Sequence, residues 1–114
     1  MRITDNQVTD IIGLASKYPA IVRVGVFGSY ARGEQTAESD IDIVYDYDKP
    51  NRNDDAYVLD ILAYAEDLTN AFDKLNIEVD CISYQGVLES SNGRIQNNIM
   101  DEIVWVYEKP FGER

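Results

Sequence analysis

Asp40 and Asp42 are the residues of this chain whose types and spacing most clearly allow chemistry. They open a segment, residues 40–45, whose alternation predicts a β-strand. Side chains alternate along a strand, so both carboxylates leave one face while Ile41 and Ile43 leave the other. Two like charges at such positions repel, and a divalent cation such as Mg²⁺ would relieve the repulsion. The pair therefore predicts a metal site that also binds phosphate oxygens.

A Gly-Ser turn lies upstream of the two aspartates, with ten residues between, and supplies the complementary half of such a site. Gly28 has no Cβ, so the backbone there can turn sharply and approach a phosphate, and Ser29 adds a hydroxyl. Gly28 and Gly33 have the spacing of a P-loop, but Glu34 and Gln35 stand where that loop requires Lys and Ser or Thr. The turn is therefore not a P-loop.

This arrangement, with an Ala-Arg-Gly after the Gly-Ser and a Ser before the first Asp, resembles a known family. It is similar to the polymerase-β-like nucleotidyltransferases, and within them to the minimal nucleotidyltransferases (MNT) that act as antitoxins to HEPN-domain toxins. The resemblance covers essentially the whole chain. Six positions carry the motif: Gly28, Ser29, Arg32, Gly33, Asp40 and Asp42.

The resemblance implies a catalytic site with two Mg²⁺ ions and ATP as substrate. It assigns nucleotide binding to Gly28, Ser29 and Arg32, although Arg32 could instead pair with a local carboxylate such as Glu38. A third acidic residue of the family comes from a later strand. Here that residue is Asp80, in an alternating segment interpreted as a central strand, where a lone carboxylate needs a partner unless it lies on an uncovered face. The catalytic and metal-binding set is then Asp40, Asp42 and Asp80.

The resemblance also implies a function and a partner. The chain would transfer AMP from ATP to a hydroxyl, typically of a tyrosine, on a cognate HEPN toxin and thereby silence the toxin. Two alternatives stay open. One is a catalytically silent antitoxin that binds its toxin sterically, and the other is a nucleotidyltransferase acting on a small molecule such as an aminoglycoside or on an RNA end.

Length and composition limit the possible classes of protein. The 114 residues predict one domain, residues 1–108, with a frayed tail at 109–114. No apolar run approaches the ~20 residues that cross a bilayer, so we expect a cytoplasmic protein without membrane contact. Histidine is absent and Cys81 is the single cysteine. This excludes Ser-His and Cys-His catalysis and an internal disulfide, and it indicates that Cys81 is a small buried hydrophobe.

The charge balance bears on the partner. The net charge is −11, and the ten cationic residues are scattered rather than gathered in a stripe. A protein that grips a phosphate backbone needs such a stripe, so we expect no stable nucleic-acid binding. The acidity is suited to a basic protein partner, or it serves solubility alone.

The periodicity predicts an α/β domain with a mixed sheet. Asp46 is expected to be a solvated loop carboxylate, and Trp105 a core or interface residue. Along α-helical and β-strand patterns, the expected elements are a helix from Thr4 or Asp5 to Tyr18, a strand at 21–27, a short helix at 28–34, a strand at 40–45, a loop at 46–53, a long helix from Asp54 or Asp55 to Leu75, a strand at 77–84, a loop at 85–92, a helix at 93–102 and a strand at 103–107.

Overall fold

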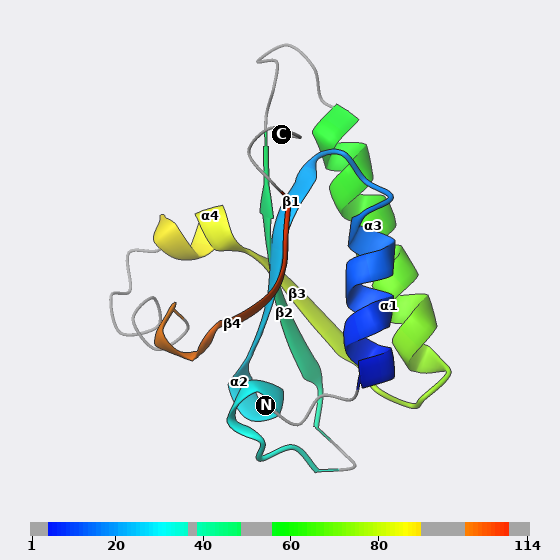
Figure 1. Cartoon of the computed structure of the whole chain (residues 1–114), viewed down its shortest axis with the longest axis vertical. Helices are drawn as coiled ribbons and strands as arrows, with labels where there is room; N and C mark the ends of the chain where they lie inside the picture. Colours follow the sequence, from blue (N-terminus) through cyan, green and yellow to red (C-terminus); the bar gives the residue numbers. More distant parts are fainter. Residues whose placement is uncertain (1–4, 37–38, 49–55, 90–99, 110–114) are drawn as a thin grey trace.

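The computed structural model describes residues 5–36, 39–48, 56–89 and 100–109 (Figure 1). Helices and strands alternate in it, as the α/β prediction requires. None of the helices in these ranges has the length and apolarity needed to cross a membrane. In chain order the elements are α1 (Asp5–Ala15), β1 (Ile21–Phe27), α2 (Gly28–Arg32), β2 (Ile41–Tyr47), α3 (Ala56–Asp73), β3 (Val79–Ser83), α4 (Tyr84–Leu88) and β4 (Val104–Glu108).

The four strands form one mixed sheet in the order β3-β2-β1-β4. Strand β1 is antiparallel to both β2 and β4, whereas β2 and β3 are parallel. Parallel neighbours need a long crossover, and α3 provides it. The predicted mixed sheet is confirmed, but the prediction of a central β3 is wrong, because this strand lies at the edge of the sheet.

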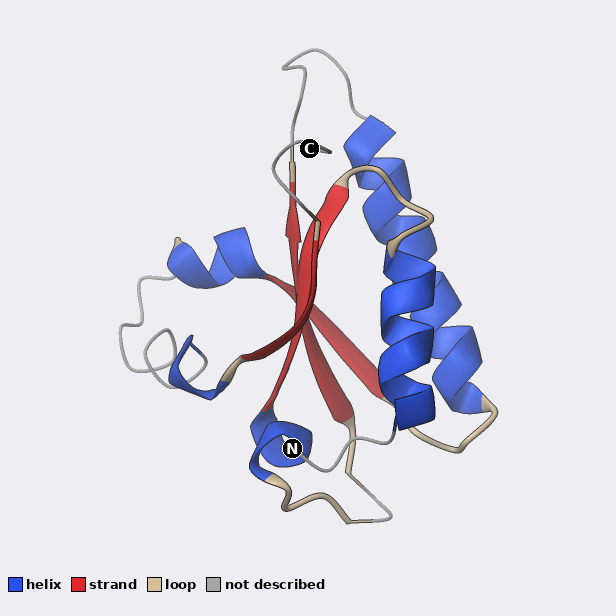
Figure 2. Ribbon diagram, viewed as in Figure 1, coloured by secondary structure: helices blue, strands red, loops and turns tan. Residues whose placement is uncertain are grey.

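One face of the sheet is covered by α1 and α3, which lie together on the same side of it (Figure 2). Val24 and Val26 of β1 and Ile41 and Ile43 of β2 point into this layer and are fully buried. The alternation predicted for residues 40–45 is therefore confirmed. Removing one such side chain from water contributes about 1.5–3 kcal/mol, so these residues fix which face of each strand turns outward.

The buried stripe of α3 is narrower than its sequence indicates. Tyr64, Leu68 and Phe72, spaced four residues apart, are at most 1% exposed, and the Tyr64 hydroxyl donates to a backbone carbonyl of α1 at 3.2 Å. Leu59 and Leu62, whose positions predict a wider stripe, are 69% and 62% exposed. The phenol takes the central position because its hydroxyl has a partner there.

Several element boundaries differ from the prediction. Helix α1 ends at Ala15, three residues early, in a turn where the Lys17 amide donates to the Leu14 carbonyl. The predicted loop after β3 begins instead with α4, because the Ser83 hydroxyl accepts the Gly86 amide at 3.2 Å and caps a helix. The predicted helix at 93–102 lies mostly outside the described residues, where only 100–102 are helical.

Within the described ranges, the second face of the sheet is covered only in part. Helix α2 follows the end of β1 and contacts β1 and β2, and α4 follows the end of β3 and contacts β2 and β3. We call this face the open face. Along β2 it carries Asp42, Val44 and Asp46, which alternate with the buried isoleucines. The candidate site residues therefore lie on the side away from α1 and α3.

Candidate active site

Gly28 and Asp42 are brought together by the pairing of β1 with β2. Phe27 is the register partner of Asp42, so the next residue, Gly28, begins its turn beside the Asp42 carboxylate. Gly28 has φ +72°, a left-handed conformation that disfavours other residues. A Cβ built at Gly28 would also lie inside contact distance of Asp42 Oδ2. Any larger residue here would displace that carboxylate, so glycine keeps the two groups in contact.

Asp80 lies directly beside Asp42 in the parallel pairing of β2 with β3. The pKa of Asp42 is raised, first by burial and then by the charges of Asp80 and Asp40. A hydrogen bond with Asp80 raises it further, whereas the charge of Arg32 lowers it. Asp42 is half-buried and Asp80 is exposed. A half-buried carboxylate whose charged form is destabilised by burial and by a neighbouring carboxylate makes a site whose energy a cation would lower.

Asp40 is the third predicted ligand and is half-buried. It precedes the first residue of β2 and contributes to raising the pKa of Asp42. Within the ranges that the structure describes, however, no three acidic, Cys or His side chains are grouped tightly enough to hold a metal ion by themselves. The pair Asp42–Asp80 still fits Mg²⁺, which usually takes one or two carboxylates and completes its shell with water and substrate phosphates.

Helix α2 carries the remaining predicted residues. Ser29 lies in its first turn, and Tyr30, only 6% exposed, inserts into the core and fixes the helix against the sheet. Gly33, with φ +72°, ends the helix, and the Glu34 amide donates to the Ser29 carbonyl at 2.9 Å. The left-handed glycine is the usual way to end such a helix.

Arg32 is held by two carboxylates. Its Nε donates to Glu34 Oε2 and its Nη1 to Glu102 Oε1, each at 2.9 Å. Both contacts raise the pKa of Arg32, the hydrogen bond with Glu34 most strongly. The predicted pairing with a carboxylate thus exists, although Glu38 lies outside the described residues. Glu102 was not found from the sequence, because nothing in the local pattern indicates a contact between residues 70 positions apart.

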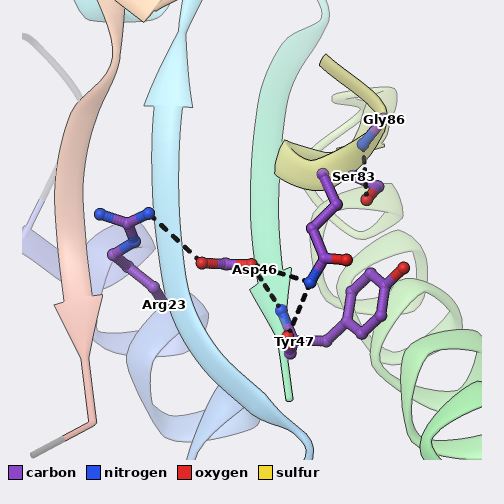
Figure 3. Close-up of polar contacts among 6 residues, drawn as sticks. Arg23, Asp46, Tyr47, Ser83 and Gly86 are labelled. Atoms are coloured by element: carbon purple, nitrogen blue, oxygen red, sulfur yellow. Dashed lines mark hydrogen bonds and ion pairs between the residues drawn. The ribbon is translucent and has the colours of Figure 1, made fainter. Parts of the chain in front are cut away.

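A second charged group occupies the open face farther along β2 (Figure 3). Asp46, expected to be a solvated loop residue, is part of β2 and pairs with Arg23 at 3.3 Å. The Arg23 Cζ lies 3.8 Å from the centre of the Trp105 ring and 4.7 Å from that of Tyr84. Gln85 Nε2 donates to Asp46 Oδ1 at 3.4 Å. We call these five residues the Arg23 cluster; the expectation for Asp46 was wrong because β2 continues to Tyr47.

A family model and several proteins of known sequence match this chain. The model described as polymerase beta, nucleotidyltransferase, matches residues 9–111. Two proteins of Methanocaldococcus jannaschii, both named "putative protein adenylyltransferase", also match. One is 33% identical over 93 residues, covering 82% of this chain and 83% of its own, and the other is 32% identical over 109 residues, covering 90% and 98%.

Solved structures match the fold. A "structure of putative minimal nucleotidyltransferase" superposes with a TM-score of 0.61 at 25% identity, covering 87% of this chain and 88% of its own. A "crystal structure of the toxin-antitoxin with AMP-PNP" superposes with a TM-score of 0.60 at 18% identity, covering 97% and 78%. The predicted polymerase-β-like fold is confirmed by these matches.

Proposed function

The chain belongs to the polymerase beta nucleotidyltransferase family, and from this premise we propose that it transfers AMP from ATP to a hydroxyl of a protein partner in a Mg²⁺-dependent reaction. The main support is that Asp42 and Asp80 lie side by side at the bend made by Gly28, where burial and the charge of Asp80 raise the pKa of Asp42. The relatives named as protein adenylyltransferases support the reaction type. The structural neighbour crystallised with AMP-PNP supports an adenine nucleotide.

The residues at the bend would have separate roles in binding the metal and the phosphates. Asp42 and Asp80, with Asp40 nearby, would hold Mg²⁺, which neutralises triphosphate charge and lowers the pKa of an attacking hydroxyl. Gly28 leaves room for the phosphates to approach the backbone, and Arg32 supplies N–H donors to them. Asp80 is the exposed member of the pair, so it is the carboxylate that an incoming hydroxyl can reach.

The transfer replaces one bond at phosphorus with another. The acceptor oxygen forms a bond to the α-phosphorus of ATP, the bond from that phosphorus to the bridging oxygen breaks, and pyrophosphate leaves. The hydroxyl proton passes to a base, and Asp80 is the candidate for that role. Phosphoryl-type transfer asks mainly for positioning and charge neutralisation, so the lack of histidine is no obstacle.

We further propose that the acceptor is a tyrosine of a cognate HEPN toxin and that the chain is its antitoxin. The structurally similar toxin–antitoxin proteins are consistent with such a partner, although their similarity to this chain shows the fold alone. The net charge of −11 favours a partner with a basic surface, because complementary charge speeds encounter. A purely steric antitoxin is the second candidate, but steric binding gives no reason for Asp42 to lie against Asp80.

The test is the intact mass of the partner protein after incubation with this chain, ATP and Mg²⁺. We expect the partner to gain the mass of one or more adenylyl groups, with none gained when Mg²⁺ is chelated. Asp42→Asn should prevent the gain while the two proteins still form a complex on gel filtration. An unchanged partner mass together with tight, inhibitory binding would favour the steric antitoxin.

A further inference from the structure

Glu102 reaches the candidate site from the far end of the chain. It precedes β4, and the pairing of Val26 with Val104 in antiparallel register places residue 102 alongside residue 28 if the register is continued by two positions. Its carboxylate accepts a hydrogen bond from Arg32 Nη1 at 2.9 Å. The bend at Gly28 thus has Asp42 on its β2 side and Glu102 on its β4 side.

Arg32 bridges these two sides. Its charge lowers the pKa of Asp42, so the guanidinium lies within electrostatic reach of that carboxylate. A guanidinium has five N–H donors in one plane, and the contacts with Glu34 and Glu102 use Nε and one N–H of Nη1. The edge between Nη1 and Nη2 has two parallel N–H donors and can bind a phosphate in bidentate fashion. Arg32 can therefore keep both carboxylates and still present donors to a triphosphate.

We propose that Glu102 is a positioning residue of the nucleotide site, which holds the Arg32 guanidinium at the bend so that it meets the triphosphate. The inference rests on the proposed function, because it presumes that a nucleotide binds there. Glu102 does not itself touch the nucleotide. It acts by fixing Arg32, whose free side chain would otherwise lose about 2 kcal/mol of rotamer entropy when it binds.

Glu102 and Glu34 differ in what they can fix. Glu34 is two residues from Arg32 and its side chain is 66% exposed, so it moves with the same turn. The Glu102 side chain is 33% exposed and belongs to the segment that enters β4. Of these two contacts, the one with Glu102 ties Arg32 to a distant segment of the chain, the entry to β4. Removal of Glu102 should therefore weaken nucleotide binding more than removal of Glu34.

Electrostatic competition would have the opposite effect, because a carboxylate paired with Arg32 competes with phosphate for the same guanidinium. Two substitutions separate the ideas. Glu102→Gln keeps an acceptor for Nη1 and removes the charge, whereas Glu102→Ala removes both. Positioning predicts that only the alanine variant binds nucleotide more weakly. Competition predicts that both variants bind it more tightly.

The experiment is calorimetric titration of the free chain with AMP-PNP in the presence of Mg²⁺, which needs no acceptor. We expect Glu102→Ala to raise Kd about three- to fivefold, and Glu102→Gln and Glu34→Ala to stay within about twofold of the wild type. Asp67→Ala is the matched control. It removes a carboxylate of similar exposure, 30%, from an ion pair with Lys17 far along the chain, and it should leave Kd unchanged.

A double-mutant cycle shows whether Glu102 acts through Arg32. In an Arg32→Ala background, Glu102→Ala should have no further effect on Kd, because the residue that it positions is gone. An unchanged Kd in Glu102→Ala, or tighter binding by both Glu102 variants, overturns the positioning role while the proposed function stands. If the wild-type chain does not bind AMP-PNP with Mg²⁺ at all, the proposed function fails and this inference with it.

Discussion

Strand β2 carries two carboxylates on its open face, four residues apart, in opposite electrostatic environments. Asp46 is paired with Arg23, and it also accepts a hydrogen bond from Gln85. Asp42 lies against the carboxylate of Asp80, and its pKa is raised by burial and by that neighbour. The same strand, the same face and the same residue type thus give one neutralised charge and one opposed charge.

The difference indicates a structural role for one carboxylate and a ligand-binding role for the other. A charge that is paired, hydrogen-bonded and covered by an aromatic ring joins elements of the fold, and the Arg23 cluster connects β1, β2, β4 and α4 in this way. A carboxylate placed against another carboxylate lowers stability unless a ligand compensates. Trp105 can cover Arg23 because it pairs with Gly25, where a Cβ would lie 3.0 Å from the indole. The ion pair with Arg23 accounts for Asp46, whereas the cation proposed above would account for the position of Asp42.

The largest expected effect comes from Asp42→Asn, which should lower the transfer rate at least about a hundredfold. The amide keeps the shape but loses the charge that would hold a cation. The rate is measured by following adenylylated partner over time. Asp46→Asn, the same change on the same face, is the control, and a comparable loss of transfer in both variants would erase the distinction between them.

Asp42→Asn should also stabilise the fold when no metal is bound. Because the pKa of Asp42 is raised in the folded state, the stability linked to this group is present below its unfolded pKa and is lost as the pH rises through the folded pKa. At pH 7 the ionised carboxylate therefore destabilises the fold, and asparagine removes that cost. We expect a higher Tm for Asp42→Asn in chelator by calorimetry; a lower Tm would show that Asp42 supports the fold.

Gly28→Ala is expected to reduce transfer about tenfold or more. The new Cβ would meet the Asp42 carboxylate and turn it from the bend. Gly33→Ala offers a matched comparison, because Gly33 also has φ +72° and the substitution carries the same backbone strain of about 1–3 kcal/mol. Both variants should unfold at similarly lower urea concentrations. Transfer should fall much further for Gly28→Ala, and equal losses would mean that strain alone is responsible.

Asp46→Asn should have the reverse profile, with a loss of stability and no loss of chemistry. It leaves the half-buried Arg23 guanidinium without its ion pair, at a cost of about 1–3 kcal/mol. Urea unfolding followed by Trp105 fluorescence measures that cost and reports on the cluster directly. Retained stability would show that the aromatic rings, and not the ion pair, hold Arg23.

The sequence was informative where neighbours along the chain determine the contact. The Gly-Ser turn and the two aspartates indicated the site because β1 and β2 are consecutive and pair, which brings Gly28 to Asp42. Alternation also predicted the buried face of β2, since burial of both Ile41 and Ile43 requires it.

What the sequence did not reveal depends on contacts between distant segments. Glu102 meets Arg32 only because β4 returns beside β1, and no local period encodes that return. The Arg23 cluster likewise joins four elements, so Asp46 looked like a loop residue. The edge position of β3 follows from the order of strands in the sheet, which alternation does not determine.

The smallest expected effect concerns Cys81 and tests the difference between the two faces of β3. Asp80 lies on the open face, whereas its neighbour Cys81 packs against the core. Burial, and secondarily the charge of Asp80, raises the pKa of Cys81 from 9.0 to about 12. At pH 8 the thiolate needed for disulfide exchange is therefore scarce, and we expect labelling by an aromatic disulfide reagent to be far slower than in urea. Stability linked to the thiol is present below the unfolded pKa and is lost as the pH rises toward 12. The stability of Cys81→Ala should therefore fall less steeply than that of the wild type as the pH rises above 9. Labelling of the native chain at the rate of a free thiol would contradict the covered position of Cys81, and with it the assignment of Asp80 to the opposite, ligand-accessible face.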